Sequence, residues 1–148
     1  MISIHKSESK YIHPLARFVT PDAIALILAV RVEDIHEIRC WHRVILVIGR
    51  HFSRFVSYAD LPPILGVELP TARDFVAWRK RWQKNRTFKA PTFWQQFYTH
   101  KYQQAASTLE LFAWQQLIST IENVFSSSTI HNLYSLYAEH RDCLQVET

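Results

Sequence analysis

The chain has 148 residues, of which 48% are hydrophobic and 20% charged, and its formal net charge is +4. This composition is typical of a globular domain with a full hydrophobic core and excludes a disordered chain. Only two glycines occur, which excludes the glycine-rich phosphate loops of P-loop and dinucleotide-binding enzymes.

The two cysteines do not make a disulfide framework and indicate free thiols in a reducing compartment. The first 18 residues lack the apolar core of a signal peptide. The longest apolar run, residues 23–30, is far shorter than the roughly 20 residues that span a bilayer. We therefore expect a cytoplasmic protein that does not enter a membrane, and no motif indicates a cofactor.

In chain order, the mixed and polar residues 1–19 are expected to form an N-terminal arm before a single domain over residues 20–148. Thr20, Pro21 and Asp22 predict a helix start, with Thr as N-cap, Pro at the first position and Asp in the first turn. The residues that follow are apolar on nearly every side, so this helix is expected at the centre of the core.

Residues 33–48 also favour a helix, because their apolar side chains recur at helical spacing. The last five, Val44–Ile48, fit a buried strand equally well, since short apolar runs are ambiguous. Residues 50–61 continue the helical spacing. The spaced side chains are Ile35, Ile38, Trp41, Ile45, Ile48, Phe52, Phe55, Val56 and Ala59.

The Pro-rich residues 61–70 break the chain before a helix over residues 71–84, which Thr71 and Asp74 cap. Further helices are expected from Pro91, after Ser107 and from Ile130. We therefore predict an all-α, single-domain, compact bundle of six or seven helices, with a short β element near Val44–Ile48 as the alternative to helix.

The segment Trp-Arg-Lys-Arg-Trp-Gln-Lys-Asn-Arg-Thr-Phe-Lys, residues 78–89, contains six cations and three aromatics, and residues 75–109 contain no acid. Phe75, Trp78 and Trp82 fall on one side of a helix, and Arg73, Lys80 and Lys84 fall on the other. No acid pairs with these cations one turn away. Cations arranged in this way favour binding to phosphates, and aromatics at their edge can stack on unpaired bases.

The sequence thus predicts a non-enzymatic protein that binds nucleic acid, DNA or RNA. The alternative is an assembly or adaptor factor that binds an acidic protein, or a second copy, because residues 103–148 carry one Arg against five acids. The predicted binding residues are Arg73, Arg79, Lys80, Arg81, Lys84, Arg86 and Lys89, with Trp78 and Trp82 shaping the site.

Residues 57–82 also resemble a helix-turn-helix, the DNA-binding family, in the turn Leu65-Gly-Val-Glu68 and the cationic helix after it. Phe75 stands where that family has a hydrophobic residue. Pro62 stands where it has a small residue in its first helix, and proline interrupts helices. The resemblance is therefore limited to the turn and the second helix.

A second candidate surface is the aromatic helix over residues 93–102, whose aromatics lie on more than one side. Such side chains dominate protein interfaces, so they could form a contact face for a partner or a second subunit. The alternative is a thick core. The five residues are Phe93, Trp94, Phe97, Tyr98 and Tyr102.

A third candidate is a metal or thiol site at His36, Cys40 and His42. His36 and Cys40 are four residues apart, so on a helix they would share one face and could bind zinc or form a nucleophile pair. The alternative is that Cys40 is a small buried hydrophobic residue. No Gly-x-Ser-x-Gly elbow occurs, and no catalytic residue is assigned.

Overall fold

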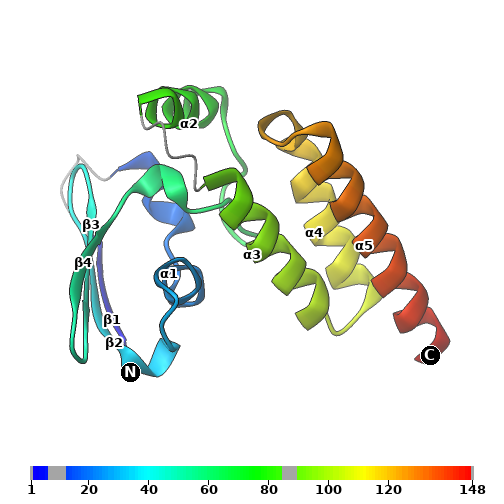
Figure 1. The fold of residues 1–148 in the computed structure, drawn as a ribbon, viewed down its shortest axis with the longest axis horizontal. Coiled ribbons are helices and arrows are strands. Elements are labelled where there is room, and N and C mark those ends of the chain that lie inside the picture. Colours follow the sequence, from blue (N-terminus) through cyan, green and yellow to red (C-terminus); the bar gives the residue numbers. More distant parts are fainter. Residues whose placement is uncertain (1, 7–12, 85–89, 148) are drawn as a thin grey trace. The chain divides into compact units, whose positions relative to one another are not determined.

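The computed structural model describes residues 2–6, 13–84 and 90–147, and the chain divides into two compact units (Figure 1). The first, here called the sheet unit, consists of residues 1–62 and 71–90. The second, the helical unit, consists of residues 63–70 and 91–148. The predicted all-α bundle is wrong, because the sheet unit contains a four-stranded sheet.

The strands of the sheet unit are β1 (Ser3–Lys6), β2 (Ile35–Cys40), β3 (Ile45–Gly49) and β4 (Ser53–Val56). They lie in the order β1-β2-β3-β4, with β1 parallel to β2 and the other pairs antiparallel. Residues of the expected N-terminal arm therefore form an edge strand. The 3-10 helix η1 (Pro14–Phe18) follows and buries Leu15, Ala16 and Phe18.

The helix predicted over residues 33–48 is wrong, and a β-bulge explains why the spacing was misleading. Ile35 pairs with Gly49 but Glu37 pairs with Ile48, so β2 contains one extra residue. In a regular strand, side chains return to the same face every second residue. The extra residue instead puts Ile35 and Ile38, three apart, on the buried face, which is also the spacing of a helix.

The alternative prediction of a strand at Val44–Ile48 is confirmed, since β3 covers all of this segment except its first residue. The helix expected over residues 50–61 is also wrong: the chain turns at Arg50 and His51 and returns as β4. The turn is closed by a hydrogen bond from the Gly49 N–H to the Phe52 carbonyl, 2.9 Å. The 3-10 helix η3 (Tyr58–Asp60) then leads away from the sheet.

One face of the sheet is covered by helix α1 (Pro21–Leu28), which packs against β2 within this unit (Figure 1). Its predicted start is confirmed, because the Thr20 hydroxyl accepts the Ala23 N–H at 3.3 Å. Ile24 of α1 and Ile38, Ile45 and Val47 of the sheet have no exposed surface. Complete burial of such side chains contributes about 1.5–3 kcal/mol each. The short helix η2 (Val32–Asp34) connects α1 to β2.

Helix α2 (Ala72–Lys84) belongs to the sheet unit, and its predicted capping box is confirmed. The Thr71 N–H donates to Asp74 Oδ2 at 2.8 Å, and the Asp74 N–H donates to the Thr71 hydroxyl at 3.4 Å. The helix-turn-helix resemblance does not extend to the structure, because residues 61–70 before α2 form no helix.

The helical unit contains α3 (Ala90–Gln104), α4 (Thr108–Thr120), the 3-10 helix η4 (Glu122–Val124) and α5 (Ser127–Glu147). The predicted helices of this part of the chain are confirmed, including the Ser107 cap, whose hydroxyl accepts the Glu110 N–H at 3.1 Å. Across the residues with a described position, no helix is long and apolar enough to cross a bilayer.

Candidate nucleic-acid interface

The outer side of α2 presents four of the predicted binding residues to solvent. Successive residues of a helix are rotated by about 100°, so Arg73 and Lys80 share the middle of this side while Arg79 and Arg81 lie on its two flanks. All four side chains are exposed. We call this surface the basic face, consisting of Arg73, Arg79, Lys80 and Arg81.

Three other predicted binding residues cannot be added to the basic face. Lys84 is the last residue of α2, and its side chain lies outside the described part of the structure. Arg86 and Lys89 are also outside the described residues.

The acid of α2, Asp74, is absent from the basic face because it is buried within the sheet unit. Its Oδ2 atom lies 2.5 Å from Nη2 of Arg17, a residue of η1. Burial opposes ionisation of Asp74, but the hydrogen bonds from Arg17 and from Thr71 outweigh it and lower the pKa of the carboxyl. Within the described residues, no ion pair joins the basic face to a carboxylate.

The two tryptophans assigned to the site support α2 and do not form a stacking surface. Trp78 is completely buried and contacts the ring of Phe75 edge-on, with centroids 5.3 Å apart. It therefore cannot stack on a base from this position. Trp82 is half-buried, and its Nε1–H donates to the Ala59 carbonyl at 3.0 Å, which attaches α2 to η3.

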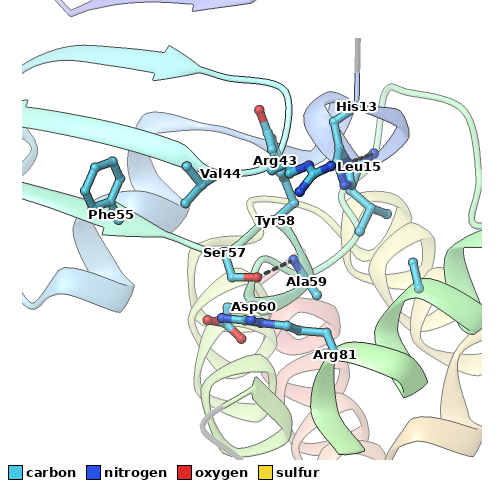
Figure 2. A pocket seen from close by; sticks show the side chains of 11 residues that line it. His13, Leu15, Arg43, Val44, Phe55, Ser57, Tyr58, Ala59, Asp60 and Arg81 are labelled. Carbon is cyan, nitrogen blue, oxygen red and sulfur yellow. Dashed lines mark hydrogen bonds between the residues drawn. The ribbon is translucent and has the colours of Figure 1, made fainter. Parts of the chain in front are cut away.

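Beside α2 the sheet unit contains a pocket of about 450 Å³ (Figure 2). Its residues come from five places: the start of η1, the β2–β3 hairpin, β4, η3 and α2. Arg43 of the hairpin and Arg81 of α2, which are far apart in the sequence, line the same pocket. The lining residues are His13, Leu15, Arg43, Val44, Phe55, Ser57, Tyr58, Ala59, Asp60, Ala77 and Arg81.

One wall of the pocket contains His13 and Tyr58, whose rings stack with centroids 4.1 Å apart. Nδ1 of His13 accepts the Leu15 N–H at 3.1 Å, and the Tyr58 hydroxyl donates to the Trp41 carbonyl. Burial, assisted by the nearby His42, lowers the pKa of His13, although Asp74 opposes this shift. Burial also raises the pKa of Tyr58, as does Cys40 beside it. Both rings are therefore uncharged at neutral pH.

Next to the pocket, two large aromatic side chains are exposed on the outer face of the sheet. Trp41 is 45% exposed and Phe55 63% exposed, and their ring centroids are 5.9 Å apart at 55°. Phe55 pairs with Leu46 across the β3–β4 ladder, and paired residues point to the same face. Phe55 also lines the pocket, so the aromatic pair and the pocket are continuous.

Sequence reasoning missed Trp41, Arg43, Phe55 and His13 as site residues. The apolar spacing of the sequence predicts Trp41 and Phe55 as buried positions of helices. The signal for strands was the β-branched run at 44–48 with turn residues Arg50 and His51 after it, followed by alternating polarity in β4. Strands would have predicted that Leu46 and Phe55 point away from the covered face.

The aromatic side chains of α3 form the core of the helical unit instead of an exposed contact face. Phe93, Trp94, Phe97, Tyr98 and Tyr102 are all buried. Their ring contacts lie within the unit, with Trp114 and Phe125 and with Tyr137. These five side chains therefore agree with the alternative of a thick core and not with an exposed contact face.

The premise of the metal and thiol site is wrong, because His36, Cys40 and His42 are not on a helix. His36 and Cys40 belong to β2, where Cys40 is buried and His36 exposed; His42 is exposed in the following turn. Throughout residues 2–6, 13–84 and 90–147, no three His, Cys, Asp or Glu side chains form a group that could hold a metal ion.

Comparison of the chain with protein-family models, with curated proteins and with solved structures found no significant match.

Proposed function

We propose that this protein binds nucleic acid through the basic face of α2. The observation that supports this is the exposure of Arg73, Arg79, Lys80 and Arg81 on one helix whose own acid, Asp74, is neutralised in the interior by Arg17. Cations that are not paired with carboxylates can contact the phosphates of a nucleic acid directly and release the counterions bound there. Each such contact makes the affinity more dependent on salt.

The test is a binding titration of a labelled oligonucleotide by fluorescence anisotropy at several salt concentrations. For two to four phosphate contacts, the slope of log K against log salt is expected to lie between about −1.5 and −3.5. The double variant Arg73→Glu/Lys80→Glu should abolish binding at about 150 mM salt. Both residues are exposed, so circular dichroism should report an unchanged fold.

The matched control is Arg31→Glu/Arg141→Glu, which changes the net charge equally but alters two residues that do not belong to α2. It should bind nearly as well as the unmodified chain. Absent or salt-independent binding would contradict the proposal. The protein could instead bind polyglutamate more tightly than the oligonucleotide, and the Arg73→Glu/Lys80→Glu variant could lose that binding. This result would assign the basic face to an acidic protein partner.

A further inference from the structure

Trp41 and Phe55 form an exposed aromatic pair on the surface of the sheet. Phe55 is 63% exposed beside Trp41 at 45%, and the two ring centroids are 5.9 Å apart, so two neighbouring rings lie in water. Leu46 and Ile48 of β3, which point to the same face, are half-buried, so the two rings are more exposed than these aliphatic neighbours. Aromatic rings on a surface next to cations are the means by which proteins hold unpaired bases, because every base has a π-face.

The pocket beside this pair suits a phosphate group. Arg43 and Arg81 are both exposed and contribute two permanent positive charges, and planar guanidinium groups match the geometry of phosphate oxygens. His13 and Tyr58 are uncharged, so the charge of the lining comes from the two arginines and one carboxylate, Asp60. The lining is therefore net positive.

Two shared residues connect the parts of this surface. Phe55 lines the pocket and contacts the Trp41 ring, and Arg81 lines the pocket and belongs to the basic face. Figure 2 shows Phe55 on β4 and Arg81 on α2, with Ser57 and Ala59 between them along the chain from β4 to η3. A nucleic-acid strand bound along α2 would thus continue past Arg81 to Arg43 in the pocket and to the aromatic pair beside it.

We infer that the sheet unit binds single-stranded nucleic acid in preference to duplex, with a base stacked on Phe55 and Trp41 and an adjacent phosphate held by Arg43 and Arg81. The inference rests on the proposed function and specifies its ligand. A pocket of about 450 Å³ is of the size that holds one small ligand, such as a nucleotide. In a duplex the bases are stacked inside the helix, so only the backbone would reach the cations.

The experiment compares a labelled oligothymidine of about 16 nucleotides with a duplex of equal length at one salt concentration. The unmodified chain should bind the single strand at least tenfold more tightly. Phe55→Ala should weaken single-strand binding roughly five- to a hundredfold, the effect of losing one base–aromatic stack, and leave duplex binding unchanged. Phe55→Trp should restore single-strand binding, because a Trp ring can also stack on a base. A purely structural role of Phe55 would not predict this recovery.

The control is Phe112→Ala, which removes an exposed aromatic from α4 of the helical unit. It should leave both affinities unchanged. Arg43→Gln should weaken single-strand binding, and Asp60→Asn should strengthen it because a negative charge leaves the pocket. Thermal unfolding monitored by circular dichroism checks that the Phe55 and Arg43 variants remain folded.

The outcomes separate the two proposals. Equal affinity for single strand and duplex, with no effect of Phe55→Ala, would overturn the inference and leave the proposed function intact. Failure to bind either nucleic acid would overturn both. A loss of duplex binding in Phe55→Ala equal to that of the single strand would also overturn the inference, because stacking acts only on unpaired bases.

Discussion

The guanidinium of Arg17 and the carboxylate of Asp74 form a largely buried ion pair that joins η1 to the first turn of α2. Arg17 also donates to the Pro14 carbonyl at 2.7 Å and lies over the ring of Phe18, 4.2 Å from its centroid. The pair neutralises Asp74 inside the sheet unit. Among the described residues, the charged side chains on the outer side of α2 are therefore all cations, which is the basis of the proposed function.

Replacement of this carboxylate tests the ion pair. Asp74→Asn should lower the free energy of unfolding by roughly 2–4 kcal/mol, since it removes the carboxylate that pairs with Arg17 and weakens the cap of α2. Urea unfolding at neutral pH measures the change. The pKa of Asp74 is lowered in the fold, so its stabilisation is present above the unfolded pKa of about 3.9 and is lost as pH falls through the folded pKa.

The difference between the unmodified chain and Asp74→Asn should therefore decrease below about pH 4. Asp34→Asn is the control, because Asp34 pairs with Arg31 on the surface. Its effect on unfolding should be much smaller. An Asp74→Asn variant as stable as the unmodified chain would show that the pair does not hold α2.

The lowered pKa of His13 predicts that the protein loses stability in mildly acidic solution. Its folded pKa is lowered by burial, so the unfolded chain takes up the proton first as pH falls. The stabilisation is complete above the unfolded pKa of about 6.5 and decreases below it, through the lowered folded pKa. The melting temperature should thus fall between about pH 7 and pH 5.

The matched variant is His13→Asn, because Asn can still accept the Leu15 N–H at the start of η1 but does not titrate. Its melting temperature should fall less over the same interval. A pH dependence identical to that of the unmodified chain would mean that other groups cause the loss.

The end of α1 predicts a stabilising substitution. Ala29 caps this helix in the left-handed region, with φ of 57° and ψ of 44°, where its Cβ is strained. Ala29→Gly should raise the free energy of unfolding by about 0.5–1 kcal/mol, because glycine removes this strain. Equilibrium urea unfolding is the measurement.

Gly66 offers the opposite change, since its φ is 86° and an added Cβ would meet no atom within 4 Å. Gly66→Ala should lower the free energy of unfolding by about 1 kcal/mol through backbone strain alone. If Ala29→Gly destabilises the protein and Gly66→Ala does not, backbone strain does not control the stability of these two positions.

Helix boundaries were predictable from the sequence wherever a local signal marked them. Thr20, Thr71 and Ser107 each accept the backbone N–H three residues later, and this hydrogen bond depends only on neighbouring residues. The sheet was not predictable in the same way. The bulge in β2 results from its pairing with β3, and the spacing that it produced between Ile35 and Ile38 is the same as that of a helix.

The candidate site shows the same division between local and tertiary information. Arg73, Arg79, Lys80 and Arg81 were recognised because they lie in a run of cations without an acid, and helical period places Arg73 and Lys80 opposite Phe75, Trp78 and Trp82. Arg43 and Phe55 could not be recognised, since only the folding of the hairpin and β4 puts them in the lining of one pocket with Arg81. Likewise, whether the five aromatics of α3 are core or surface depends on α4 and α5, which bury them.

The sequence by itself determined the capped helices and the excess of cations on α2, because periodicity and capping are properties of adjacent residues. The tertiary structure alone decided which side chains remained exposed, since exposure depends on segments far apart in the chain. It buried Asp74, Trp78 and the aromatics of α3, and it left Trp41 and Phe55 in solvent beside two arginines.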